Sequence, residues 1–348
     1  MIAALDATPL TLTSGGLARY VSELSLALAR EYPEDTFALL SDQAFAMPAD
    51  APGNLIAGPR SASDPRWWLR GLRRAIAQTG AQVFHGTNFE VPYLGRTPAI
   101  LTIHDLSPWK DAAWHGSGAD RVRSRTPWLV RLRRARMILT VSEAMRREIV
   151  GHFGVAEDRV RAIALAASEA FRPVGGPAAD RPYFLFVGTL EPRKNVAALV
   201  EAWRETRAET GADLWISGRT RADFVPIAQM PGINMMGEVS DGDLPRLYSG
   251  ALGFVYPTFY EGFGLPVLEA MQCGCPVVTS RDPAVTELAG GAAIHAASVA
   301  EIAEAMRELA ANADLRRSMA DRGLARAAQF SWTRTAQATH SLYQELAS

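Results

Sequence analysis

The sequence predicts an α/β protein made of two doubly wound domains, each built on a parallel sheet. Short apolar runs alternate with longer helical patterns along all 348 residues. These runs are continuous rather than alternating, which is typical of parallel strands buried on both faces. A chain of this length exceeds one ordinary hydrophobic core, so two domains are expected.

The elements follow in the same order in both halves. The first half is expected to hold strands at 2–7, 37–42, 83–88, 99–105, 137–143 and 160–166, with helices such as 17–31 and 64–79 between them. The second half is expected to hold strands at 183–189, 213–218, 234–239, 252–258, 276–280 and 292–296. Residues 171–182 are rich in Pro, Gly and Ala and have no periodicity, which indicates a linker. The predicted domains are therefore 1–170 and 183–330, followed by a terminal segment, 331–348.

Composition excludes several classes of protein. The net charge is −1, so no overall field draws the chain to nucleic acid. Cys273 and Cys275 are one residue apart, too close for an ordinary disulfide and too few for a zinc site, which fits a reducing cytoplasm. No apolar run reaches the roughly 18 residues of a membrane span, and no basic leader opens the chain. We expect a protein that is soluble or attached to a membrane surface.

Two glycine-rich or basic stretches predict anion binding at helix starts. SGGLARY, 14–20, offers a Ser14 cap, while Gly15 and Gly16 let a ligand approach the backbone. An ordinary glycine turn is the alternative, since a lone pair of glycines is weak evidence. In FVGTLEPRKNV, 186–196, Arg193 and Lys194 begin a helix, where cations oppose the dipole by roughly 0.3–1 kcal/mol. An anionic partner would compensate this placement better than solvent would.

A third stretch, YEGFGLPVLEA, carries two acids eight positions apart. Glu261 lies in the loop after a predicted strand, and Glu269 lies in the helix that Pro266 begins. A buried carboxylate needs hydrogen-bond donors, and the two hydroxyls of a ribose would supply them to Glu269. Glu269 could instead simply favour the helix dipole, but Glu261 has no such explanation.

Together these motifs resemble the GT-B glycosyltransferases of the family 4 type, which are retaining enzymes. EGFGLPVLE matches the E-x7-E motif of that family, VGTLEPRKN its phosphate-binding loop and SGGLARY its N-terminal glycine loop. FSW, 330–332, matches the point where the last helix returns to the first domain. The resemblance covers essentially the whole chain. It implies two Rossmann-like domains facing a central cleft, with acceptor binding in the first and nucleotide-sugar binding in the second.

The resemblance also implies roles for single residues. Glu269 would hold the ribose, Glu261 the hydroxyls of the transferred sugar, and Lys194, helped by Arg193, the diphosphate. The base would rest against the loop at 237–239. Thr189 stands where the family often has an arginine, and Arg193 is the candidate replacement. The implied donor-binding set is Gly15, Gly16, Gly188, Thr189, Arg193, Lys194, Gly237, Val239, Glu261, Gly262, Phe263, Gly264, Leu265 and Glu269.

The predicted first domain supplies the acceptor side. His104, in TIHDLSP, would lie near the reacting carbon and, with Glu261, Lys194 and Arg193, completes the catalytic set that the resemblance implies. Asp105 could orient its ring. Ser142 and His85 are further acceptor-side candidates, although histidines at strand ends more often serve packing.

The chemistry expected is hexosyl transfer by front-face attack, in which the leaving phosphate takes the proton of the acceptor. Neither a metal nor another cofactor is expected, because Asp241 and Asp243 in DGD suit a helix cap better than a D-x-D metal site. GDP-mannose is the favoured donor and a UDP-sugar such as UDP-glucose the second. The acceptor would be a glycan or a lipid-linked glycan. Competing interpretations are a sugar-nucleotide epimerase and a non-catalytic nucleotide-sugar-binding protein.

One arginine-rich stretch raises the question of a membrane. Residues 121–136, RVRSRTPWLVRLRRAR, hold seven arginines and no acid, and paired tryptophans lie among further arginines at 66–74. Basic faces with aromatic residues suit an anionic membrane surface. A solvated helix face with core tryptophans is the alternative.

Overall fold

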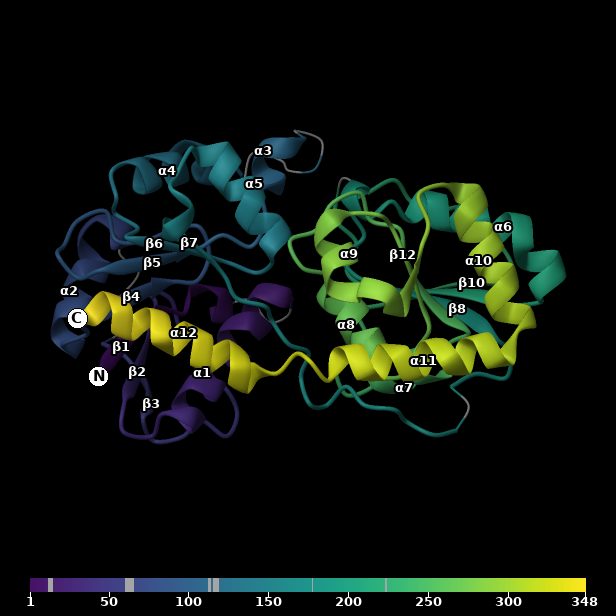
Figure 1. Cartoon of the computed structure of the whole chain (residues 1–348), viewed down its shortest axis with the longest axis horizontal. Coiled ribbons are helices and arrows are strands. Elements are labelled where there is room, and N and C mark those ends of the chain that lie inside the picture. Colours follow the sequence, from purple (N-terminus) through teal and green to yellow (C-terminus); the bar gives the residue numbers. More distant parts are fainter. Residues whose placement is uncertain (12–14, 60–65, 112–113, 115–118, 177, 223) are drawn as a thin grey trace. The chain divides into compact units, whose positions relative to one another are not determined.

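The computed structural model describes residues 1–11, 15–59, 66–111, 114, 119–176, 178–222 and 224–348. The chain forms two compact units (Figure 1). Unit 1 comprises Met1–Leu165 and Ser331–Ser348, and unit 2 comprises Ala166–Phe330. The division therefore falls at residues 165 and 166, and the stretch 171–182 belongs to unit 2.

Unit 1 is built on a seven-stranded sheet in which every pair of neighbours is parallel. The strands are β1 (Ile2–Asp6), β2 (Thr36–Leu40), β3 (Leu55–Ala57), β4 (Val83–Gly86), β5 (Ala99–Thr102), β6 (Met137–Thr140) and β7 (Val160–Ala162), in the order β3-β2-β1-β4-β5-β6-β7. Six of them were predicted. The edge strand β3 was not, because it has three residues and buries only Leu55.

The helices of unit 1 are α1 (Gly16–Glu31), α2 (Leu72–Thr79), α3 (Ser107–Lys110), α4 (Asp120–Arg131), α5 (Glu143–Phe153) and α12 (Trp332–Ala347). The continuous helix expected at 64–79 is wrong in its first part, since a π-helical turn, Trp67–Gly71, precedes α2, and residues 64 and 65 lie outside the described part. The last helix of the chain, α12, packs on α1 (Figure 1). Thr335 Oγ1 on α12 donates to Ala164 O at 2.7 Å.

Unit 2 repeats the plan with six parallel strands in the order β10-β9-β8-β11-β12-β13. They are β8 (Tyr183–Val187), β9 (Asp213–Ser217), β10 (Ile233–Gly237), β11 (Gly253–Tyr256), β12 (Val277–Thr279) and β13 (Ala293–His295), and all six were predicted. The helices are α6 (Val196–Thr210), α7 (Leu244–Gly250), α8 (Leu265–Gln272), α9 (Pro283–Ala289), α10 (Val299–Ala311) and α11 (Ala313–Ala327). The predicted fold class, two doubly wound α/β domains with all-parallel sheets, is confirmed.

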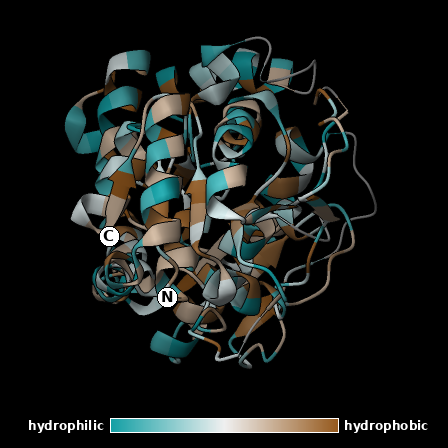
Figure 2. Cartoon of the chain, turned by 90° about the vertical axis from the view of Figure 1, so that its right-hand side faces the viewer, coloured by the Kyte–Doolittle hydropathy of each residue, from teal (hydrophilic) through white to brown (hydrophobic). Residues whose placement is uncertain are grey.

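The apolar strands form the core of each unit. All five residues of β8 are buried, as are all four of β5. Figure 2 shows mainly hydrophobic strands lying among helices that carry hydrophilic stretches. No helix in the described ranges is both long and apolar enough to cross a membrane.

Strand order locates the switch point of each sheet. In unit 2 the chain runs from β8 outward through β9 to β10 and then returns to β11 on the other side of β8. In unit 1 the same reversal occurs between β1 and β4. Loops that follow the two strands at such a point diverge and leave room for a ligand at the carboxyl edge of the sheet.

Candidate active site

The loops after β8 and β11 meet at the switch point of unit 2. The loop after β8 leads through Gly188 to a short 3-10 turn, Pro192–Lys194, and then to α6. The loop after β11 leads through Thr258 and Glu261 to α8. The two are joined directly, because Phe259 N donates to Arg193 O at 2.9 Å. Two stretches more than 60 residues apart in sequence thus form one site.

The centre of this site is a buried ion pair between Lys194 and Glu261. The ammonium of Lys194 donates to Glu261 Oε1 and to Tyr256 Oη, the latter at 2.7 Å. Tyr256 Oη and Thr258 Oγ1 also donate to Glu261 Oε1, each at 2.9 Å. Oε1 therefore accepts three hydrogen bonds. Oε2 faces Arg193 Nη1 at 3.3 Å and keeps capacity for further donors.

Arginines extend the cluster on both sides of Glu191. Arg193 Nη2 donates to Glu191 Oε1 at 2.8 Å, and Arg221 Nη1 donates to Glu191 Oε2 at 2.7 Å. Arg193 Nη1 also donates to Tyr260 O at 2.7 Å. Glu191 thus holds the two guanidinium groups apart and in place. The cluster thus contains two carboxylates, Glu191 and Glu261, and three cationic side chains, Arg193, Lys194 and Arg221. Its net charge is +1.

Burial and charge set the protonation of the cluster. Burial alone would raise the pKa of Glu261, but the ammonium of Lys194 and the guanidinium of Arg193 lower that pKa to about 2. Burial, together with the charge of Arg193, lowers the pKa of Lys194, while Glu261 opposes that shift. Nearby, burial is the main cause that raises the pKa of Asp282 to about 6, although its carboxylate caps α9. Glu261 is therefore ionised throughout the neutral range.

Glu269 lies on the helix that follows. Gly264, at φ 98°, precedes α8 without any side-chain cap, so the helix begins with amides directed at the loop. The side chain of Glu269 is buried, and Tyr248 Oη on α7 donates to Glu269 Oε2 at 3.2 Å. The two acids of the motif consequently occupy different places, with Glu261 inside the charge cluster and Glu269 against α7.

The structure places the residues expected to contact the base at the end of β10. Gly237 has φ 65°, and no atom would meet a Cβ there. Gly237 O accepts from Gly218 N at 2.8 Å, which ties the loop after β9 to this strand end. Gly218 itself must be glycine, because a Cβ would lie 1.9 Å from Gly188 O. Val239 follows two residues beyond the strand.

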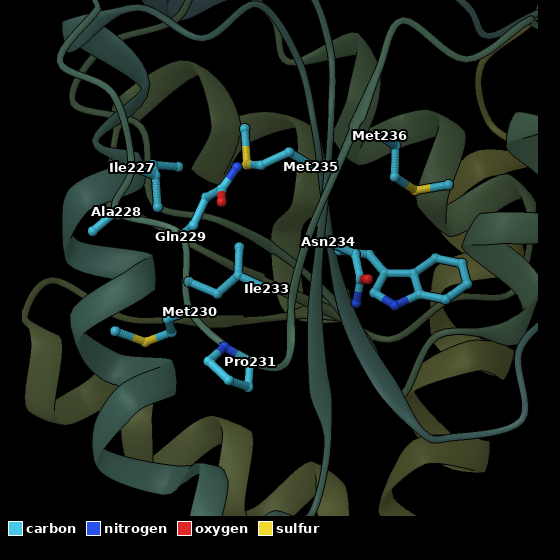
Figure 3. Close-up of a pocket in the computed structure, with 10 residues that line it drawn as sticks. Ile227, Ala228, Gln229, Met230, Pro231, Ile233, Asn234, Met235 and Met236 are labelled. Atoms are coloured by element: carbon cyan, nitrogen blue, oxygen red, sulfur yellow. The ribbon is translucent and has the colours of Figure 1, made fainter.

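A hollow of about 720 Å³ opens beside the same strands (Figure 3). It is lined by Trp215 on β9, residues 227–231 and residues 233–236 on β10, and none of the predicted site residues lines it. The hollow and the charge cluster are therefore separate features of unit 2.

In unit 1, His104 is held by its neighbours in one tautomer. Its Nε2 lies 2.9 Å from Thr87 O, and a carbonyl can only accept, so Nε2 carries the proton. Burial lowers the pKa of His104, so the ring is neutral near pH 7 with its lone pair on Nδ1. The expectation for Asp105 needs correction: its carboxylate accepts from the backbone N–H and Oγ of Ser107, at the start of α3. The carbonyl of Thr87 orients the ring instead.

His85 is not an acceptor-side residue in this structure. Its side chain is fully buried, Nδ1 lies 2.6 Å from Tyr343 Oη on α12, and Nε2 lies 2.6 Å from Thr102 Oγ1 on β5. Burial lowers the pKa of His85 to about 3. With both nitrogens occupied, His85 links β4, β5 and α12 and cannot reach a ligand.

The remaining candidates lie at helix starts. Ser142 is buried and caps α5, its Oγ accepting from Met145 N at 3.1 Å. Gly15, at φ 113°, precedes α1, and Gly16 begins it. Ser14 lies outside the described residues. Gly262 and Phe263 lie in the turn before α8, Leu265 is the first residue of that helix, and Thr189 follows Gly188 in the loop after β8.

The acidic pair of DGD lies at the start of α7. Asp243 occupies the N-cap position as expected, but its carboxylate accepts from Ser240 Oγ at 2.6 Å rather than from a helix amide. Within the described ranges, no group of three or more His, Cys, Asp and Glu side chains could hold a metal ion.

Sequence reasoning missed several members of the site. Tyr256 and Thr258 bind Glu261, Glu191 and Arg221 flank Arg193, and Tyr248 binds Glu269. Glu191 lies inside a quoted motif, and Tyr256 and Thr258 lie in the strand predicted at 252–258, directly before another motif, so their positions gave a usable signal. Arg221 and Tyr248 come from other loops and helices, and only the fold brings them to the site.

Comparison with known proteins shows the family of this chain. A family model described as Glycosyltransferase Family 4 matches residues 14–166, and one described as Glycosyl transferases group 1 matches residues 181–312. The chain is 37% identical over 293 residues to the O-antigen chain mannosyltransferase B of Escherichia coli, which covers 76% of this chain and 74% of that protein. The chain belongs to glycosyltransferase family 4. This glycosyltransferase has the GT-B fold that the sequence motifs predict.

This glycosyltransferase is also similar to proteins that are not named as mannosyltransferases. It is 32% identical over 267 residues to the glycogen synthase of Mycobacterium tuberculosis, covering 71% of this chain and 63% of that protein. The solved structure of Anabaena Alr3699/HepE in complex with UDP-glucose aligns with a TM-score of 0.73 over 99% of both chains, at 17% identity. At that identity the likeness supports the fold alone.

Proposed function

We propose that this glycosyltransferase moves mannose from GDP-mannose to a glycan or a lipid-linked glycan, with retention of configuration and without a metal ion. The observation that carries the proposal is the buried cluster of Lys194, Glu261 and Arg193 at the switch point of unit 2. It supplies cations, an ionised carboxylate and helix amides within one loop pair. The mannosyltransferase relative from E. coli supports the choice of sugar.

Lys194 would stabilise the charge that develops on the leaving diphosphate. The ammonium has three N–H bonds and uses two of them, on Glu261 and Tyr256, which leaves the third for a phosphate oxygen. The excess positive charge of the cluster and the uncapped start of α8 act in the same direction. Cations that are already held in position need no reorganisation when the bond breaks, and this raises kcat rather than affinity alone.

Glu261 and Glu269 would orient the donor through its hydroxyls. Glu261 Oε2 keeps capacity for hydrogen bonds from the transferred sugar, because the other protein donors converge on Oε1. Glu269 would accept from the ribose. Glu261 would thus hold the transferred sugar and Glu269 the nucleoside. The phosphates would lie at the loop and helix start that separate these two acids in the sequence.

Retention would follow from attack on the same face that the phosphate leaves. With a pKa of about 2 and Oε1 occupied by three donors, Glu261 is a weak nucleophile, so a covalent sugar–enzyme intermediate is disfavoured at this residue. A phosphate oxygen of the leaving group would take the proton of the acceptor hydroxyl. Neutral His104 would contact the transferred sugar. Trapping a sugar on any carboxylate of the enzyme would refute this mechanism.

A UDP-sugar is the second candidate donor. The glycogen synthase relative favours a glucosyl-type transfer, and a solved structure of the same fold holds UDP-glucose. Acceptors carried on lipid would place the enzyme at the cytoplasmic face of a membrane, which we propose as its location.

The test is a donor panel with product analysis. The purified protein is incubated with GDP-mannose, UDP-glucose and other nucleotide sugars, with and without EDTA, and released nucleotide is measured in the presence of glycan acceptors. We expect GDP release from GDP-mannose at an undiminished rate in EDTA, and an α-linked product by NMR. Turnover restricted to UDP-sugars would refute the donor assignment, and loss of activity in EDTA with recovery in Mn²⁺ would refute metal independence.

A further inference from the structure

Three segments of unit 1 bring exposed apolar side chains and arginines together. They are residues 66–74 before and within α2, residues 93–96, and residues 125–136 at the end of α4. We name them together the Arg/Trp patch. Trp68 O accepts from Tyr93 N at 2.9 Å, which joins the first segment to the second. Arg125 Nη1 donates to Tyr93 Oη at 2.7 Å and Arg134 Nη2 donates to Gly95 O at 2.9 Å, which joins the second to the third. The patch is one continuous region.

Large apolar side chains are exposed in this region and rarely elsewhere on unit 1. Trp128 is 60% exposed, Leu132 64%, Leu94 45% and Leu69 37%. Among the described residues of unit 1, only Ile56 joins them as an exposed large hydrophobic side chain. Trp128 lies in the last turn of α4, and Leu132, the residue directly after the helix, donates its N–H to Trp128 O at 2.9 Å. The two side chains therefore lie on the same side of this helix end, away from the buried Leu129 and Val130.

The charge of the patch is positive only. The three segments contain no Asp or Glu. The nearest acid in the loop, Glu90, is occupied by Arg121 at 2.7 Å and by Tyr93 Oη at 2.8 Å. Nine arginines of the patch make no ion pair with the described residues: Arg70, Arg73, Arg74, Arg96, Arg125, Arg131, Arg133, Arg134 and Arg136. Such crowding of like charges is unfavourable unless an anionic partner approaches.

We propose that the Arg/Trp patch docks unit 1 on an anionic lipid bilayer. Arginines would meet the phosphate headgroups, while Trp128 and the three leucines would enter the boundary between headgroups and acyl chains. Leucines distinguish this partner from a nucleic acid, since they neither stack on bases nor bind phosphate and would gain little there. This proposal rests on the proposed function, because a lipid-linked acceptor would require the enzyme to work at a membrane surface.

Vesicle co-sedimentation tests the proposal without any donor sugar. The full chain is mixed with phosphatidylcholine vesicles that contain 0% or 30% phosphatidylglycerol, at low and high salt. We expect binding to the anionic vesicles, weakened at least tenfold in 0.5 M NaCl, and little binding to the neutral ones. Equal binding to both kinds of vesicle would overturn the proposal.

Two double variants separate the apolar and the charged contributions. Trp128→Ser with Leu132→Ser, and Arg131→Gln with Arg133→Gln, should each weaken binding to anionic vesicles about tenfold or more. The matched controls lie on unit 2: Val225→Ser, which changes a side chain that is 80% exposed, and Arg204→Gln with Arg317→Gln on α6 and α11. The controls should bind as the unaltered protein does.

Donor hydrolysis, measured on the same variants, distinguishes the two proposals. Weakened vesicle binding by the patch variants, with unchanged hydrolysis of GDP-mannose, supports the patch and leaves the donor site intact. Binding by the patch variants at the level of the unaltered protein would overturn the proposal, as would tighter binding to a short RNA or DNA duplex that the Trp128/Leu132 variant does not weaken. Absence of hydrolysis with normal vesicle binding would count against the proposed function only.

Discussion

Replacing Lys194 by methionine tests the centre of the proposed site. The side chain of Lys194 is 8% exposed. Methionine keeps most of its apolar stem and removes the ammonium, which donates to Glu261 and Tyr256. The pKa of Glu261 sets an upper limit on the loss of stability. The surroundings of Glu261 lower its pKa from 4.5 to about 2, which corresponds to roughly 3 kcal/mol in favour of the charged form. Lys194 is the largest contributor to that lowering.

Part of this stabilisation survives the substitution, because Arg193 still faces Glu261 at 3.3 Å and a buried ammonium no longer has to be desolvated. We therefore expect the free energy of unfolding to fall by roughly 1–3 kcal/mol. Turnover should fall much further, by about 10²–10³ in kcat, because the leaving diphosphate loses a cation held in position.

The chain contains its own matched control. Lys110 is the only other lysine; its side chain is 44% exposed, and its ammonium lies 3.4 Å from Glu148 Oε1. Lys110→Met should change the free energy of unfolding by no more than about 0.5 kcal/mol and leave kcat unchanged. Urea denaturation and initial rates of GDP release from GDP-mannose measure both quantities. If the two lysine variants behave alike, Lys194 has no role in catalysis.

Three further outcomes follow from the geometry. Glu261→Gln should remove roughly 3 kcal/mol from the free energy of unfolding at neutral pH, because the folded state lowers the pKa of Glu261 to about 2. This contribution is fully present above pH 4.5 and is lost as the pH falls toward 2. Urea titrations of both proteins at pH 7, 4 and 3 measure it, and parallel curves of stability against pH would contradict it. Glu269→Gln should weaken GDP binding roughly 10–100-fold in calorimetry with little change in Tm, since the amide still accepts from Tyr248, and unchanged GDP affinity would remove Glu269 from the ribose site. His85→Ala should lower the free energy of unfolding by roughly 2–4 kcal/mol and leave donor hydrolysis intact, because the ring links Tyr343 and Thr102 in the core; loss of hydrolysis in a protein that remains folded would show that His85 does more than pack.

The fold was largely predictable because its signal is local. Continuous apolar runs such as YFLFV predict buried parallel strands wherever they occur, and the strands of unit 2 follow them closely. The strand β3 carries no such signal, since two of its three residues are exposed. It exists because the rest of the sheet brings β2 into register with it, so that Ala38 lies beside Ile56. The π-helical turn before α2 was equally invisible, because its residues suit an α-helix by pattern.

The site was predictable only where its residues lie within one motif. Glu261 and Lys194 could be named, but their pairing could not, because it depends on β8 and β11 being neighbours in the sheet. The histidines show the opposite limit. His85 and His104 both end apolar runs, and only tertiary contacts reveal that one is enclosed by Tyr343 and Thr102 while the other is oriented by Thr87. Sequence spacing contains no information on those partners.

The path of the chain between the units has a practical consequence. Because α12 belongs to unit 1, unit 2 is a single uninterrupted segment inserted into unit 1, whose two pieces join through contacts such as Thr335 with Ala164. Residues 166–330 can therefore be exchanged as one cassette between relatives through two junctions, which would separate the contributions of the two units to substrate preference. A truncation after residue 330, by contrast, would remove α12 from unit 1, although the rest of unit 1 is encoded at the start of the gene.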